Sequence, residues 1–177
     1  MTDRVRVVPF DPARADHRAA FRDLNVAWIE AHFVVEARDR HELDDPDAHI
    51  LAHGGRIFMA QADGANVGEI LGTCALLAEP DGACELAKMA VHASARGRGV
   101  GRALGEAAVA AARARGAPRI DLLSKTVLGP AIGLYRALGF VEVPLPATDY
   151  ARANIKMVLE LSHTRGLAER PAVGDGP

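Results

Sequence analysis

Three glycines stand at alternate positions in the segment RGRGVG, residues 96–101, between a predicted strand and a predicted helix. Glycine adopts backbone conformations with positive φ that other residues avoid, so this spacing predicts a tight turn whose successive N–H groups converge. The following helix adds unpaired N–H groups and the positive end of its dipole. Arg96, Arg98 and Arg102 add positive charge. The segment therefore predicts a strand–loop–helix unit that binds a pyrophosphate.

Two other phosphate-binding motifs do not fit this segment. A P-loop requires a glycine–lysine pair followed by serine or threonine, and the chain contains no such triplet. A dinucleotide fingerprint would need glycine at position 102 or 104, where the chain has Arg102 and Leu104. A tight turn with solvated arginines is the remaining alternative. Three glycines each cost about 1 kcal/mol of backbone entropy, which favours the anion-binding interpretation.

Hydrophobic periodicity and turn residues predict the order of strands and helices. Asp11 followed by Pro12 predicts a helix N-terminus, and Pro46 predicts the end of a second helix. Turn residues at 63–66 and 79–82 join three successive strands, which favours an antiparallel meander. The predicted strands span residues 5–9, 56–62, 67–77, 83–92, 120–123, 140–143 and 154–161, and the predicted helices span residues 11–33, 36–45, 101–115 and 129–138.

The length of 177 residues suits one domain with a full core. We expect this domain to span residues 1–163, and residues 164–177, which lack periodicity, to form a flexible tail. A net charge of −2 argues against nucleic acid as a partner, and the chain lacks the run of about 18 apolar residues that a membrane span requires. No signal-peptide pattern begins the chain, so we expect a cytoplasmic protein. Neither Cys74 nor Cys84 lies in a ligand cluster, so we expect no metal.

Three segments in order carry a family resemblance. RGRGVG resembles the Gln/Arg-x-x-Gly-x-Gly/Ala motif of the GNAT superfamily of N-acetyltransferases. ELAKMAV, residues 85–91, is similar to the strand that precedes this motif, and PAIGLYRALGF, residues 130–140, is similar to the family's AxxLYxxxGF helix and turn. The resemblance covers about residues 4–161. It implies the GNAT acyl-CoA N-acyltransferase fold, a mixed α/β (α+β) structure in which about four helices flank a twisted, mostly antiparallel sheet of about six to seven strands.

The resemblance implies acetyl-CoA as the co-substrate. Its pyrophosphate would lie on the N–H groups of the glycine loop, and its pantetheine arm would pair beside the preceding strand like an additional strand. A backbone N–H of that strand would polarise the thioester carbonyl. The implied acetyl-CoA contacts are Met89, Ala90, Val91, Arg96, Gly97, Arg98, Gly99, Val100, Gly101 and Arg102.

Two side chains are candidates for the chemistry. Tyr135 is similar to the family tyrosine whose hydroxyl lies near the coenzyme sulfur, and a phenol stays protonated at pH 7 and can donate to a departing thiolate. A core aromatic is the alternative. Glu85 is the best candidate for the base that deprotonates the amine, because it lies on the strand leading to the thioester site. A solvent-facing or paired glutamate is the alternative there, and His92 is a second candidate base.

One position departs from the family pattern. Many members carry an asparagine three residues before the position of Ala131, where this chain has Leu128. The contact of that asparagine with the coenzyme is therefore missing, or it is made by Ser124, Lys125 or Thr126.

The first helix and the segment before the last strand shape the acceptor pocket in this family. Glu30 could attract a cationic amine and Arg152 could bind a carboxylate, whereas for Trp28 a core position is favoured over contact with a ligand. The candidate substrate residues are Trp28, Glu30, Tyr150 and Arg152, with Asn25, His32 and Asp149 nearby.

The implied activity is transfer of an acetyl group from acetyl-CoA to a primary amine, by direct attack in a ternary complex. The expected acceptor is a small molecule or an amino-acid-like compound. A protein N-terminus or lysine is an alternative acceptor, and a non-catalytic acyl-CoA-binding sensor is an alternative function. The arginine cluster also allows a nucleic-acid binder, which the net charge of −2 disfavours. The resemblance leaves a homodimer open.

Overall fold

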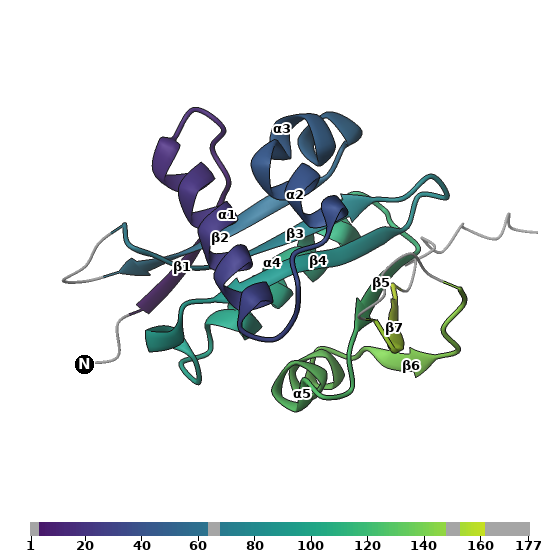
Figure 1. The fold of residues 1–177 in the computed structure, drawn as a ribbon. Coiled ribbons are helices and arrows are strands. Elements are labelled where there is room, and N and C mark those ends of the chain that lie inside the picture. Colours follow the sequence, from purple (N-terminus) through teal and green to yellow (C-terminus); the bar gives the residue numbers. More distant parts are fainter. Residues whose placement is uncertain (1–3, 64–67, 148–152, 162–177) are drawn as a thin grey trace, which may run out of the picture.

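One sheet organises the fold of this chain (Figure 1). The structure is a computed structural model that describes residues 4–63, 68–147 and 153–161. Within these ranges seven strands pair in the order β1-β2-β3-β4-β5-β7-β6, and every neighbouring pair is antiparallel except β4–β5, which is parallel. The strands are β1 (Arg4–Pro9), β2 (Arg56–Asp63), β3 (Ile70–Ala78), β4 (Cys84–Val91), β5 (Arg119–Ser124), β6 (Val141–Val143) and β7 (Ile155–Glu160).

Helices cover both faces of the sheet. On one face lie α1 (Ala15–Glu30), α2 (Ala37–Asp44) and α3 (Pro46–His49), and on the other lie α4 (Val100–Ala114) and α5 (Gly129–Ala137) (Figure 1). Two short 3₁₀ helices, Leu51–His53 and Ala93–Ala95, complete the described helices. None of the described helices combines the length and apolar character that crossing a membrane requires.

The residues of β3 show how the sheet separates two cores. Cys74 and Leu76 pack with α4, while Ala75 and Leu77 pack with α1 and α2. Side chains alternate between the two faces of a strand, and here both faces are covered. This double burial explains why β3 is an almost unbroken apolar run in the sequence.

The start of α1 differs from the prediction. The helix begins at Ala15, so Asp11 and Pro12 do not form its cap and first turn. The side chain of Asp11 instead accepts a hydrogen bond from the Ala13 N–H (2.9 Å), and the Asp11 N–H donates to Nδ1 of buried His17 (3.0 Å). Aspartate closes such local turns as readily as it caps helices, which is why the pattern misled.

Pro46 ends one helix and begins another. The prediction that α2 ends before Pro46 is confirmed, but Pro46 also stands in the first turn of α3. The Asp45 side chain caps α3 by accepting a hydrogen bond from the Ala48 N–H (3.1 Å). The expected number of about four helices becomes five α-helices in the described ranges, while the expected six to seven strands are confirmed.

A bulge in β4 and a divergence of β4 from β5 prepare the site. β4 and β5 pair only at Cys84–Ile120 and Glu85–Asp121. On its other edge β4 pairs with β3, but two residues of β4, Lys88 and Met89, lie opposite the single residue Cys74. Lys88 has a φ of 51°, and it is the one non-glycine residue with positive φ in the described ranges. Beyond Glu85, none of the described strands pairs with the β5-facing edge of β4.

Candidate active site

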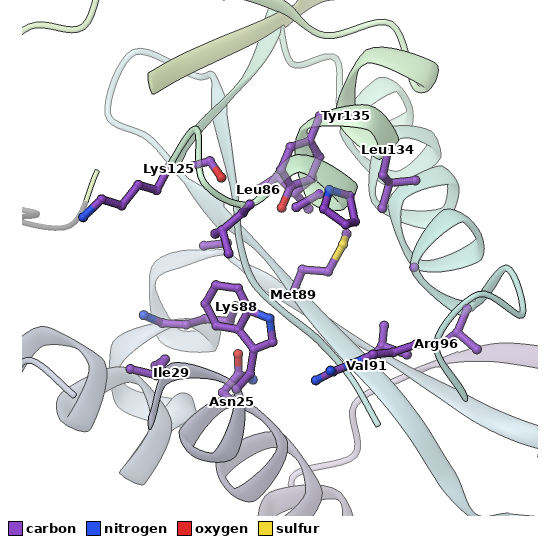
Figure 2. A pocket seen from close by; sticks show the side chains of 18 of the residues that line it. Asn25, Ile29, Leu86, Lys88, Met89, Val91, Arg96, Lys125, Leu134 and Tyr135 are labelled. Atoms are coloured by element: carbon purple, nitrogen blue, oxygen red, sulfur yellow. The ribbon is translucent and has the colours of Figure 1, made fainter. Parts of the chain in front are cut away.

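A cavity of about 510 Å³ lies where β4 and β5 diverge. Figure 2 shows side chains of α1 at one end and of α5 at the other, with side chains of β4 between them. The glycine loop, the start of α4 and the segment after β5 close the remaining sides. One hollow thus joins the predicted anion-binding loop to Glu85 and Tyr135, two residues 50 positions apart in sequence.

The glycine loop has the geometry that its sequence predicts. Gly97 and Gly99 have φ values of 73° and 80°, and a Cβ at either residue would meet nothing within 4 Å. These glycines are therefore required by the backbone conformation and not by crowding. The first hydrogen bond of α4 runs from the Ala103 N–H to the Gly99 carbonyl (3.0 Å). The N–H groups of residues 100–102 precede this bond in the first turn of the helix, and these residues line the cavity.

The arginines of the loop occupy different positions. Arg96 and Arg102 line the cavity, whereas Arg98 lies outside its lining. Nη1 of Arg102 also lies 3.6 Å from Oε1 of Glu106. Both side chains are exposed, so this ion pair is a weak interaction in water. The loop thus combines converging N–H groups with two cavity-lining cations, which suits a polyanion such as a pyrophosphate.

Tyr135 on α5 reaches the cavity from the side opposite α1. Figure 2 shows its hydroxyl pointing into the cavity toward β4. Its ring contacts buried Phe140 edge-on, with centroids 6.1 Å apart. Burial raises the pKa of Tyr135 to about 12, so the hydroxyl is a proton donor throughout the neutral range.

Glu85 lines the cavity where the pairing of β4 with β5 ends. Its side chain is 15% exposed, and its Oε2 lies 3.3 Å from Nη2 of Arg38. Burial raises the pKa of Glu85; the guanidinium of Arg38 opposes this shift, and the nearby carboxylates Glu79 and Glu42 reinforce it. Glu85 is thus both cavity-lining and ion-paired. The second candidate base, His92, is exposed, bonds Ser94 through Nδ1 (2.7 Å) and is not part of the lining.

The α1 end of the cavity consists of Asn25, Trp28, Ile29 and Phe33. Trp28 and Phe33 are half-buried and contact each other, with ring centroids 6.0 Å apart. Asn25 is almost fully buried, and its Nδ2 donates a hydrogen bond to the Phe21 carbonyl (2.8 Å). The other polar atom of its amide, Oδ1, is a hydrogen-bond acceptor. Figure 2 shows this amide facing the cavity.

Other predicted residues of the acceptor side are placed differently. Glu30 is exposed and is not part of the cavity lining. Tyr150, Arg152 and Asp149 lie outside the described residues. Phe33, which the sequence did not suggest, lies beneath Nζ of Lys125 at 5.4 Å from the ring centroid. An aromatic residue at the end of a predicted helix carries no signal for such a contact with a segment 92 positions away.

Two of the three predicted substitutes for the family asparagine line the cavity. Leu128, Ser124 and Lys125 line the cavity. Thr126 instead pairs with Asn154: its N–H donates to Asn154 Oδ1 (2.8 Å), and its hydroxyl accepts from Asn154 Nδ2 (3.0 Å). Of the three predicted substitutes, Ser124 and Lys125 are therefore in position to contact a ligand.

Comparisons with known proteins agree with this geometry. A family model described as "Acetyltransferase (GNAT) domain" matches residues 53–142, about half of the chain. No curated protein matches the sequence significantly. Among solved structures, a GNAT-family acetyltransferase from Staphylococcus aureus has a TM-score of 0.75 at 17% identity, over 90% of this chain and all of that one. An acetyltransferase from Streptococcus agalactiae has a TM-score of 0.73 at 23% identity, over 89% and 98% of the two chains. A GNAT acetyltransferase from Elizabethkingia anophelis with acetyl-CoA bound has a TM-score of 0.63 at 16% identity, over 89% and 98%.

Proposed function

The chain belongs to the GNAT acetyltransferase family, and from this premise we propose that it transfers an acetyl group from acetyl-CoA to the primary amine of a small molecule. The observation that carries the proposal is the continuous cavity along the open edge of β4, with the glycine loop, Tyr135 and Glu85 on its walls. Donor and acceptor would occupy this cavity together, and the amine would attack directly in a ternary complex.

The glycine loop and the open strand edge fit acetyl-CoA. The N–H groups from Gly97 to Arg102 would hold the pyrophosphate, with Arg96 and Arg102 neutralising its charge. The unpaired edge of β4 offers main-chain groups at Met89–Val91 for the amides of the pantetheine arm. Acetyl-CoA supplies an acetyl thioester when bound. A similar structure, from Elizabethkingia anophelis, has acetyl-CoA bound, which supports this assignment.

Tyr135 and Glu85 would hold the two protons of the reaction. The hydroxyl of Tyr135 would donate to the sulfur as it departs, and its raised pKa keeps it protonated for that role. Glu85 would accept a proton from the amine through a carboxylate oxygen, and its raised pKa makes it a stronger base than an exposed glutamate. A backbone N–H at the β4 bulge would stabilise the oxyanion that forms between them.

The α1 end would receive the acceptor. Trp28 and Phe33 offer apolar faces, Asn25 offers an amide, and Glu85 is the one carboxylate among the described lining residues. These groups favour a small amine with an apolar body, free or as part of an amino-acid-like compound. Tyr150 and Arg152 remain proposed contacts for a polar group of the acceptor, and Glu30 would act only by attracting cationic amines from solvent.

Binding of acetyl-CoA and turnover test the proposal separately. Millimolar acetyl-CoA should raise the melting temperature of the purified protein, and Gly99→Glu should abolish the shift by placing a negative charge in the loop. Gly82→Glu is the matched control, because Gly82 has a similar φ of 85° but lies in the β3–β4 turn. Thiol release with a panel of small amines then measures transfer. No melting shift would overturn the donor assignment, and tight binding without acylation of any amine would indicate a sensor.

A further inference from the structure

Lys88 occupies a position that is unfavourable on two counts. Its backbone has a φ of 51°, a left-handed conformation that a residue with a Cβ avoids. Its side chain is only 4% exposed, although lysine is rarely buried. Glycine would remove the first cost and an apolar side chain would remove the second. Lysine at this point of β4 therefore indicates a contribution of its ammonium group that neither residue could make.

The ammonium group joins β4 to α2. Nζ of Lys88 lies 2.9 Å from Oδ1 of Asp39, which is fully buried, and 2.7 Å from Oε2 of Glu42, whose side chain is 12% exposed. Asp39 also accepts a hydrogen bond from the Glu36 N–H (3.0 Å), which closes the capping box at the start of α2. A buried ion pair of this kind fixes its two elements relative to each other, because removing one partner leaves a buried charge uncompensated.

The ion pairs continue from Lys88 to Glu85. Arg38 donates from Nε to Glu42 Oε1 (2.9 Å), and its Nη2 lies 3.3 Å from Glu85 Oε2. The charged groups thus form a chain in the order Asp39, Lys88, Glu42, Arg38, Glu85. One end of this chain, Asp39, lies on α2, and the other end, Glu85, lies on β4 at the cavity. Figure 2 shows the side chain of Lys88 extending away from that of Met89, the other residue of the bulge.

We propose that Lys88 is a positioning residue for acetyl transfer: by clamping α2 to the bulge of β4, it fixes the main chain at Met89 and, through Glu42 and Arg38, the carboxylate of Glu85. The proposal rests on the proposed function for its kinetic consequences, but the fixed bulge is a property of the protein alone. Lys88 is one of the residues that line the cavity, and its ammonium is paired with Asp39 and Glu42. Its ammonium neutralises Glu42, which otherwise competes with Glu85 for Arg38.

Lys88→Met tests the clamp, because methionine keeps an unbranched chain and removes the charge. We expect kcat to fall by about 100-fold, a loss that misplacement of catalytic groups by about 1 Å can cause. The Kd for acetyl-CoA should rise by a smaller factor than kcat falls, because the glycine loop keeps its contacts with the pyrophosphate and only the main chain at Met89 is displaced. Lys88→Arg should restore much of kcat. Arg18→Met is the control, because Arg18 pairs α1 with Asp47 on the same face without touching β4.

The pH profile separates positioning from a merely structural role. The charged groups around Glu85 are Arg38 and Glu42 on α2, Glu79 before β4 and, opposite on β5, Asp121 with its partners Arg119 and Lys156. Without the ammonium of Lys88, Glu42 binds Arg38 more strongly and faces Glu85 unneutralised. The acidic limb of kcat/KM should therefore move to higher pH in Lys88→Met. A lower melting temperature with kcat and the pH profile unchanged would overturn the proposal.

Amide hydrogen exchange of the β4 amides that pair with β3 on either side of the bulge, around Ala87 and Ala90, tests the clamp without turnover. We expect exchange to accelerate at least tenfold in Lys88→Met and to stay unchanged in Arg18→Met. If Lys88→Met does not fold, Glu42→Gln takes its place. The side chain of Glu42 is 12% exposed, and this substitution removes the charge that links Lys88 to Arg38. It should shift the same pH limb, and an unshifted limb would overturn the link. If the wild-type protein acetylates no amine, the proposed function fails, while the exchange rates still decide on Lys88.

Discussion

Oε2 of Glu85 lies 3.3 Å from Nη2 of Arg38, so the one carboxylate that lines the described part of the cavity is held by a guanidinium from α2. Burial raises the pKa of Glu85 and Arg38 opposes the shift, and the net direction is upward. A base acts in its deprotonated form, so kcat/KM should be low at acidic pH and should rise with pH as Glu85 loses its proton. This rise should occur at a pKa above the usual glutamate value of about 4.3. Glu85→Gln should lower kcat by about 100-fold or more and remove this limb.

Glu142→Gln provides the control for this prediction. Glu142 is an exposed glutamate on β6, away from the cavity, and its substitution should leave the rate and the pH profile unchanged. Stopped assays of thiol release across pH 5–9, corrected for the pKa of the acceptor amine, measure both variants. A Glu85→Gln variant with wild-type kcat would exclude Glu85 as the base.

Tyr135→Phe should lower kcat by about 10- to 100-fold while leaving the Kd for acetyl-CoA nearly unchanged. The variant removes the hydroxyl that points into the cavity, but the ring keeps its edge-on contact with Phe140. Because the pKa of Tyr135 is raised to about 12, wild-type activity should show no loss from tyrosine ionisation up to pH 10. Calorimetry and steady-state kinetics measure the two effects, and an unchanged kcat would place Tyr135 among packing residues only.

Two glycines should respond to alanine with opposite signs. A Cβ at Gly55 would lie 2.7 Å from Cγ2 of Ile50 and 2.8 Å from the Ile50 carbonyl, so the main chain would have to move. Gly55→Ala should lower the free energy of unfolding by about 1–3 kcal/mol. A Cβ at Gly133, on the exposed side of α5, would meet nothing within 4 Å, so Gly133→Ala should raise it by up to about 1 kcal/mol. Urea unfolding of both variants measures the difference, and equal effects would contradict this account.

The sequence predicted the parts of the fold and the cavity that depend on local patterns. The positive φ values of Gly97 and Gly99, the helix that follows them and the placement of Tyr135 on α5 all agree with the predictions from spacing. Alternation and turn residues also predicted the meander of β2, β3 and β4. These features are local because glycine, proline and the hydrophobic period act within a few residues.

The features that the sequence did not predict depend on contacts between distant segments. Lys88 is part of a motif strand in the sequence, but in the fold its buried ammonium donates to Asp39, 49 residues away. Phe33 and Lys125 come together only because α1 and the segment after β5 border the same cavity. Asp11 has ordinary capping chemistry, but in the fold it closes a local turn with Ala13 and donates its N–H to the ring of His17. The one sequence signal for the buried ion pair between Lys88 and Asp39 was a lysine within an apolar strand.

His17 should make the stability of the protein depend on pH. Its ring is 1% exposed, and burial lowers its pKa below the unfolded value of about 6.5. Nδ1 accepts a hydrogen bond from the Asp11 N–H, an arrangement that protonation of Nδ1 would break. The unfolded chain therefore binds the proton more readily than the folded chain. The stabilisation is fully present above about pH 6.5 and is lost as the pH falls from there through the lower folded pKa.

Urea unfolding between pH 8 and pH 5 measures this dependence. The free energy of unfolding of the wild-type protein should fall below pH 6.5 with a slope of up to about 1.4 kcal/mol per pH unit from this single site. His17→Gln should be less stable at pH 8 but should show a shallower slope, because the variant cannot take up the proton. His53→Gln is the control, since His53 is exposed and its substitution should leave the slope unchanged. Equal slopes in the wild type and His17→Gln would show that other groups govern acid unfolding.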